Sequence, residues 1–252
     1  MAEKDEAGVV TAGLLVIGDE ILSGRTKDKN IGHIAETLTA NGIDLREVRV
    51  VPDVEEEIVA AVEALRQRYS YLFTTGGIGP THDDITADCV AKAFGVKLAV
   101  DPRAVAMLLE RIPAKDMNEA RLRMARIPDG AEIVLNPVSK APGFRLGNVI
   151  VMAGIPAVMQ GMLEGVLPSL KTGRKFLSET IDAGLREGDV ATELGAIAKK
   201  HPDAIIGSYP YSNERGFFTR LVVRARDEDK LKAAKADIEA MIARLKPSKA
   251  AI

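Results

Sequence analysis

Short apolar runs alternate with amphipathic segments over the first 170 residues of the chain. The run over residues 11–17 is typical of a buried strand, whereas Ile31, Ile34 and Leu38 share one face of the helix expected over residues 30–41. The same reasoning predicts strands at residues 43–51, 71–75, 132–135 and 149–153, and helices at about residues 54–65, 84–94, 102–112 and 156–170. Strands that alternate with helices predict an α/β fold with a mainly parallel sheet covered on both faces.

A change in composition at residues 168–175, where Pro, Ser, Thr and Gly accompany three basic residues, predicts a linker. After it, the pattern predicts strand, helix, strand, strand and helix, which describes a second, smaller α+β domain. We therefore expect a flexible tail over residues 1–10, a large domain over residues 11–170 and the small domain over residues 176–247.

Composition and charge narrow the functional classes. The 34 Lys and Arg residues nearly balance the 36 Asp and Glu residues, which gives a net charge of −2 over 252 residues. A nucleic-acid or membrane surface held by bulk charge is therefore not expected. Cys89 is the single cysteine, and the polar N-terminus lacks the apolar core of a signal peptide. These features favour a cytoplasmic protein that holds any anionic ligand through local contacts.

The segment from Thr74 to Thr86, TTGGIGPTHDDIT, has the most informative pattern. We expect it to join a strand to a helix, so that the N–H groups of its glycines and the positive end of the helix suit a phosphate group. Asp83 and Asp84 add oxygen ligands of the kind that Mg²⁺ shares with phosphates. The alternative is an ordinary glycine turn in which Asp84 caps the helix.

Two further acid-bearing loops follow strands of the same predicted sheet. GDEILSGR, continuing to Asp28 and Asn30, follows the first strand, and Asp53 follows the second. Because ligands bind outside the carboxyl ends of parallel strands, we expect the three loops to converge on one edge. Carboxylates that are packed together require a cation. The alternatives are a helix cap for Asp53 and solvated loop positions for Asp19 and Glu20.

Two more loops add candidates. One joins a strand to a helix through Gly154 and Pro156, and the other holds Lys140 among turn-forming residues, as a phosphate partner or as a solvated lysine. The candidate ligand-binding residues are therefore Asp19, Ser23, Gly24, Asp28, Thr75, Gly76, Gly77, Gly79, Pro80, Thr81, Lys140, Gly154 and Pro156.

At these residues the chain resembles the MoaB/Mog molybdopterin-binding domain family, and within it the N-terminal region of CinA proteins. GDEILSGR, TTGGIGPTHDDIT, NPVSKAPGF and the Gly-Ile-Pro loop occur in matching order and spacing over about residues 11–170. VVPD followed by GGIGPTHDD is also similar to the molybdopterin-binding-like domain of eukaryotic FAD synthase. The segment after Lys175 resembles the middle domain of CinA proteins more weakly.

The resemblance implies a three-layer α/β/α fold, a cleft for a pterin or a nucleotide, and a homo-oligomer, either a dimer or a trimer. In the Mog members, aspartates at the positions of Asp53 and Asp84 are implicated in molybdenum cofactor assembly. In the CinA and FAD-synthase relatives, the cleft is linked to hydrolysis of ADP-ribose or FAD with a divalent cation, Mg²⁺, Mn²⁺ or Co²⁺, often helped by K⁺. The amidohydrolase domain of CinA and the nucleotidyltransferase domain of FAD synthase are not matched, so neither activity is predicted.

We therefore expect metal-dependent hydrolysis of a nucleotide diphosphate. In this hypothesis Asp83 and Asp84 hold the cation, and Asp53 orients the attacking water as a general base. Two alternatives stay open: binding of molybdopterin or a nucleotide without turnover, and adenylyl transfer to molybdopterin in cofactor biosynthesis.

Overall fold

The computed structural model describes residues 8–214 and 216–246. It divides into two compact units, residues 1–173 and 174–252, each of which is described by itself below. The division falls inside the segment that the composition marks as a linker. Of the tail expected over residues 1–10, residues 1–7 lie outside the described residues, and Val10 is already the first residue of strand β1.

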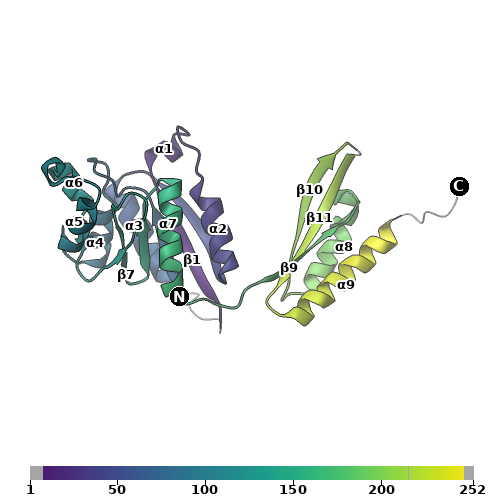
Figure 1. Cartoon of the computed structure of the whole chain (residues 1–252). Helices are drawn as coiled ribbons and strands as arrows, with labels where there is room; N and C mark the ends of the chain where they lie inside the picture. The colour runs from purple at the N-terminus through teal and green to yellow at the C-terminus, as the bar shows by residue number, and fades with distance from the viewer. Residues whose placement is uncertain (1–7, 215, 247–252) are drawn as a thin grey trace. The chain divides into compact units, whose positions relative to one another are not determined.

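A six-stranded sheet forms the centre of the first unit (Figure 1). Its strands are β1 (Val10–Ile17), β2 (Ile43–Val51), β3 (Tyr71–Thr75), β6 (Glu132–Val134), β7 (Gly143–Leu146) and β8 (Val149–Met152). They lie in the order β2-β1-β3-β8-β7-β6. The four strands β2, β1, β3 and β8 are parallel, whereas β7 is antiparallel to both of its neighbours. β6 therefore runs in the same direction as β8.

Helices cover both faces of this sheet, as the alternation of side chains along the strands requires. The helices are α2 (Asn30–Ala40), α3 (Glu55–Arg68), α4 (Thr86–Phe94), α5 (Pro102–Leu109) and α7 (Pro156–Val166). Leu14 and Val16 of β1 share a buried cluster with residues of α2 and α7. Leu15 and Ile17 share a second cluster with residues of α3, α4 and α5. The predicted three-layer α/β/α fold is confirmed.

Several short elements escaped prediction because their patterns are too brief to show a period. They are α1 (Asp19–Leu22), β4 (Leu98–Val100), η1 (Ala114–Asp116), α6 (Glu119–Arg123), β5 (Arg126–Pro128), β7 and η2 (Leu167–Ser169). β4 and β5 pair as a separate antiparallel ribbon. The helix expected to reach residue 170 ends at Val166, where a 3₁₀ turn containing Pro168 follows.

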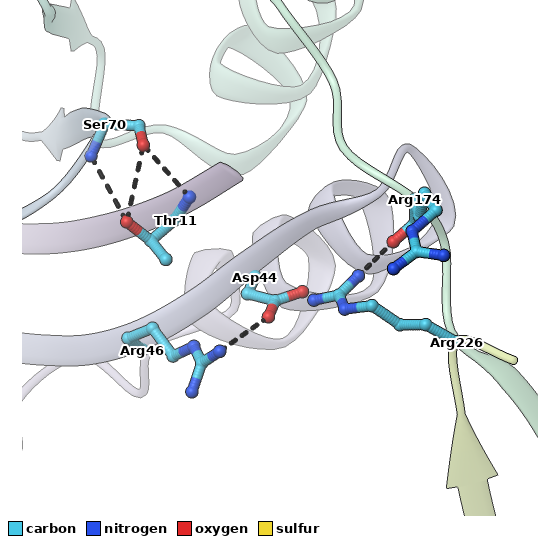
Figure 2. A network of polar contacts seen from close by, with 6 residues as sticks. All are labelled: Thr11, Asp44, Arg46, Ser70, Arg174 and Arg226. Carbon is cyan, nitrogen blue, oxygen red and sulfur yellow. Dashed lines mark hydrogen bonds and ion pairs between the residues drawn. The ribbon is translucent and has the colours of Figure 1, made fainter. Parts of the chain in front are cut away.

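Hydrogen bonds join the amino-terminal ends of the neighbouring strands β1 and β3. Thr11 on β1 and Ser70, just before β3, each donate a backbone N–H to the hydroxyl oxygen of the other, both at 3.3 Å (Figure 2). On the neighbouring strand β2, Arg46 forms an exposed ion pair with Asp44 at 2.9 Å. Because β2, β1 and β3 are parallel, their carboxyl ends lie together at the opposite edge of the sheet.

The second unit is the small α+β domain that the pattern predicts. Its elements are β9 (Leu177–Asp182), α8 (Glu187–Lys200), β10 (Ile205–Asn213), β11 (Gly216–Ala225) and α9 (Glu228–Leu245). The strands form an antiparallel sheet in the order β10-β11-β9. Its core is separate and aliphatic, with Leu221 and Val223 of β11 packed against Leu194 and Ile238 of the helices. Among the described residues, no helix is long and apolar enough to span a membrane.

Candidate functional site

The carboxyl ends of the parallel strands lie together at one edge of the large sheet. Ile17 of β1 pairs with Val51 of β2, and Thr75 of β3 pairs with both Val16 and Met152. The loops that follow these strands border a cleft of about 500 Å³. The structure therefore brings together the loops that were expected to converge.

Most of the predicted site residues face this cleft. Those that line it are Asp53, Gly76, Gly77, Gly79, Pro80, Asp83, Asp84, Gly154 and Pro156. The others lie near the same edge or in adjoining loops without lining the cleft: Asp19, Ser23, Gly24, Asp28, Thr75, Thr81 and Lys140.

The first glycines of the turn after β3 allow a close approach of backbones that no other residue permits. Gly76 has a φ of 103°, and a Cβ there would lie 2.1 Å from the carbonyl oxygen of Ile17. A Cβ at Gly77, with a φ of 64°, would lie 2.2 Å from Oγ1 of Thr86. That Thr86 hydroxyl donates to the carbonyl of Gly76 at 3.0 Å. The turn is therefore held tightly against β1 and the start of α4.

Asp84 organises the rest of this loop and does not cap the helix. Its Oδ2 accepts hydrogen bonds from the backbone N–H of Thr81 at 2.8 Å and from the Thr81 hydroxyl at 2.5 Å. Helix α4 begins two residues later, with Ile85 at its N-cap position and no side-chain cap. The capping alternative and the helix start at residue 84 are therefore wrong, because the Asp84 carboxylate closes a turn of its own.

Asp53 also has a partner other than the helix that follows it. Its Oδ2 accepts the backbone N–H of Asp19 at 3.0 Å, while the N-cap of α3 is Val54, without a side-chain cap. Burial raises the pKa of Asp53 above its ordinary value, and the negative charges of Asp19, Glu20 and Asp83 raise it further. The hydrogen bond from Asp19 opposes this rise. The carboxylates after β1, β2 and β3 therefore influence one another electrostatically.

The acids fit a cation only if the ligand supplies part of its coordination. Among the described residues, no group of three or more His, Cys, Asp or Glu side chains is arranged to hold a metal ion. Glu20, Asp53 and Asp83 nevertheless line the same cleft. Mg²⁺ in phosphate sites is commonly held by one or two carboxylates together with phosphate oxygens and waters. The donor set suits that arrangement rather than a closed protein cage.

Three other candidates have local structural partners. Lys140, with a φ of 67°, forms an ion pair with Glu110 at 2.8 Å. Asp28 accepts the N–H groups of Asn30 and Ile31 through Oδ1, at 3.1 and 2.8 Å, and so fixes the start of α2. The Asn30 side chain donates to the carbonyl of Gly154 at 2.8 Å, which ties that helix to the loop after β8.

Glu20, an acid of one of the loops that were expected to converge, also lines the cleft. Sequence reasoning missed several other lining residues. They are Ile17, Gly18, Thr26, Ile78, Met124, Asn136, Ser139, Ala141, Ala153, Ile155 and Val158. Asn136 had a usable signal, because Asn-Pro marks the start of a turn. Met124 had none, since it reaches the cleft from the segment between α6 and β5, over forty residues beyond the glycine turn.

The fold and the position of the cleft are typical of α/β proteins, in which ligands bind outside the carboxyl ends of the strands. The comparisons with known proteins narrow this class. The family described as "Probable molybdopterin binding domain" matches residues 13–172, and the family described as "FAD synthase, middle domain" matches residues 175–248. The chain therefore belongs to the molybdopterin-binding domain family, with a middle domain of the FAD synthase type after it.

Individual relatives agree with this assignment. A protein from Archaeoglobus fulgidus is 31% identical over 229 residues, which cover 91% of this chain and 96% of that protein. A CinA-like protein from Desulfosudis oleivorans is 38% identical over 76% of this chain, but the match spans only 49% of that protein. The crystal structure of the protein CinA from Thermoplasma acidophilum has a TM-score of 0.61 at 34% identity, covering 65% of this chain and 99% of that chain.

Proposed function

We propose that the cleft hydrolyses the diphosphate bridge of a nucleotide such as ADP-ribose or FAD, with the help of a divalent cation. The observation that carries the proposal is the placement of Asp53 beside other acids, in a cleft that also contains the glycine turn. A fixed glycine turn suits binding of a diphosphate. Neighbouring carboxylates suit a cation that neutralises its charge.

In the proposed reaction, a water oxygen attacks one phosphorus atom, and the bond from that phosphorus to the bridging oxygen breaks. A divalent cation, Mg²⁺, Mn²⁺ or Co²⁺, would neutralise the phosphate charge, with ligand oxygens from Asp83 and Asp84 and from Glu20, which lines the same cleft. The Asp53 carboxylate takes the proton from the water, which its raised pKa favours. The backbone of Gly76, Gly77 and Gly79 holds the diphosphate. ADP-ribose would give AMP and ribose 5-phosphate, and FAD would give AMP and FMN.

The experiment measures AMP release from ADP-ribose and from FAD with Mg²⁺, Mn²⁺ or Co²⁺, each with and without K⁺. We expect AMP with at least one combination and none after chelation of the divalent cation. For the variant Asp53→Asn, which lacks the proposed base, the matched control is Asp129→Asn, because Asp129 is an exposed acid that does not line the cleft. Absence of AMP from a folded protein under every combination would contradict the proposal.

A second candidate is binding of molybdopterin or a nucleotide without turnover. It is favoured by the lack of a three-residue metal-binding group among the described side chains. In that case a ligand raises the melting temperature in a saturable manner and is recovered unchanged by mass. A third activity, adenylyl transfer to molybdopterin, would consume ATP only when the pterin is added. Measuring ATP consumption with and without pterin therefore distinguishes it from both hydrolysis and simple binding.

A further inference from the structure

The polarity of the cleft changes along the order of the strands. Asp53 follows β2 and Glu20 follows β1, the glycine turn follows β3, and Ile155 and Ser139 follow β8 and β6. Because β6 runs in the same direction as β8, its following loop reaches the same edge of the sheet. Adjacent strands lie about 4.8 Å apart, so the three steps from β2 to β8 span roughly 14 Å. Asp53 and Glu20 lie at one end of the cleft, Asp83 and Asp84 follow the glycine turn in its middle, and the other end carries Ile155 and Ser139.

Asn136 fixes the hydrogen-bonding role of Ser139. Its Oδ1 accepts the backbone N–H groups of Val138 and Ser139, both at 3.0 Å. Since backbone N–H groups only donate, the atom facing them must be the amide oxygen, and the other atom is Nδ2. Nδ2 donates to Ser139 Oγ at 2.6 Å and to the carbonyl of Ala141 at 2.8 Å. Ser139 Oγ is therefore an acceptor towards Asn136, and its own hydrogen remains to be donated.

No protein acceptor takes that hydrogen among the residues described here, and Ser139 lines the cleft. The lining of the same cleft also includes the apolar side chains of Met124, Ala141, Ile155 and Val158. Ile155 keeps 66% of its surface exposed, so its side chain is open to a ligand in the cleft. An apolar wall with one directed hydrogen-bond donor is the composition of a site for a heterocyclic ring.

We infer that this end of the cleft is the seat of the nucleobase or other heterocycle of the ligand. Ser139 donates to an acceptor atom on the edge of the ring, and Ile155 and Met124 contact its face. The diphosphate then lies over the glycine turn, beside Asp83 and Asp84, and Asp53 and Glu20 lie beyond it. This inference rests on the proposed function for the class of ligand, and it makes Ser139 a specificity-determining residue.

The test uses two probes that cannot be hydrolysed. One is the α,β-methylene analogue of ADP-ribose, which carries a base, and the other is methylenediphosphonate, which does not. Dissociation constants are measured by calorimetry in the presence of Mg²⁺ for the full chain and for Ser139→Ala. We expect Ser139→Ala to weaken the analogue about 5- to 10-fold and to leave methylenediphosphonate unchanged, because one hydrogen bond to the ring is lost. Ile155→Ala should likewise weaken binding of the analogue and leave binding of methylenediphosphonate unchanged.

Ser178→Ala is the control, because Ser178 is an exposed serine of β9. Thermal unfolding checks that each variant remains folded. Equal loss for both probes, no loss for either, or a wild-type protein that binds the analogue no more tightly than methylenediphosphonate would overturn the ring seat. Ser139-dependent binding of the analogue, with ADP-ribose left intact by the wild-type protein, would instead reject hydrolysis and keep the seat.

Discussion

At the scale of single residues, the surroundings of Asp53 disfavour its charge, whereas its proposed role as a base requires that charge. Burial and the charges of Asp19, Glu20 and Asp83 raise the pKa of its carboxyl group, so the folded protein disfavours its ionised form. A carboxyl group of this kind binds its proton more tightly in the folded state than in the unfolded state. Its contribution to stability therefore increases as the pH falls and is unfavourable near neutrality. Such a cost is expected where function requires the charge.

Asp53→Asn removes this charge and the proposed base together. We expect the rate of AMP release to fall by about 10²- to 10⁴-fold, while the melting temperature at pH 7 stays the same or rises. In the unmodified protein, kcat should decline as the pH falls through the raised pKa of Asp53, because the base becomes protonated. Steady-state rates and thermal unfolding of both proteins from pH 4 to 8 provide the measurement. A variant that keeps full activity would remove Asp53 from the mechanism.

Gly76 is the second residue whose substitution has a well-defined expected effect, here on stability. In Gly76→Ala, the new methyl group would meet the carbonyl oxygen of Ile17 and the residue would be strained by its positive φ. We expect the free energy of unfolding to fall by about 2–4 kcal/mol. Gly165→Ala is the control, since a Cβ there meets nothing within 4 Å and Gly165 lies in α7. Urea unfolding of the two variants tests this, and equal stability would show that the turn can move aside.

At the scale of elements, the unpredicted segment from α6 to β5 contacts the loop that contains the glycine turn and helix α4, which follows it. Nη2 of Arg123 donates to the carbonyl of Asp84 at 3.2 Å. Arg126 holds the Asp88 carboxylate of α4 through two hydrogen bonds, at 2.7 and 2.6 Å. Met124, between them, lines the cleft. The two arginines thus connect the segment to the loop and to the helix that follows it.

Arg123→Ala should therefore act on the position of the loop rather than on chemistry. We expect kcat/KM to fall about tenfold, with a loss of about 1 kcal/mol in stability, because one hydrogen bond to the loop is lost. Arg123→Lys should recover part of the activity. Arg121→Ala, on the same short helix but bonded to Asp116 instead, is the matched control. If Arg121→Ala and Arg123→Ala behave alike in steady-state kinetics, α6 matters only for folding.

The elements show where sequence reasoning succeeds and where it stops. Most strands and helices that form the two cores have a clear apolar run or helical period, and apart from β7 their placement was predicted to within a few residues. The start of α4 was misplaced because a carboxylate before a helix serves equally as a cap or as a turn closure. Only the contact of Asp84 with Thr81 decides between them. Segments of three to five residues, such as β5 and α6, depend on tertiary packing for their conformation.

At the scale of the whole molecule, the described cleft residues all belong to the first unit, and each unit has its own core. A fragment of residues 8–173 should therefore fold cooperatively and keep its ligand affinity and AMP release within about threefold of the full chain. Gly173 is retained because its N–H donates to the carbonyl of Gly42 at 3.0 Å. Calorimetry and the AMP assay compare the two proteins. A folded but inactive fragment would assign part of the function to residues 174–252.

The sequence by itself determined the layered α/β architecture, the separate α+β unit and the glycine- and acid-bearing loops, because these depend on local periodicity and turn chemistry. Only the tertiary structure decided that Asp53 bonds to Asp19, that Lys140 pairs with Glu110, and that Ser139 and Met124 reach the cleft. The physical reason is that strand order and register bring together residues from distant parts of the chain. Each of those side chains has several possible partners, and only the folded arrangement selects one.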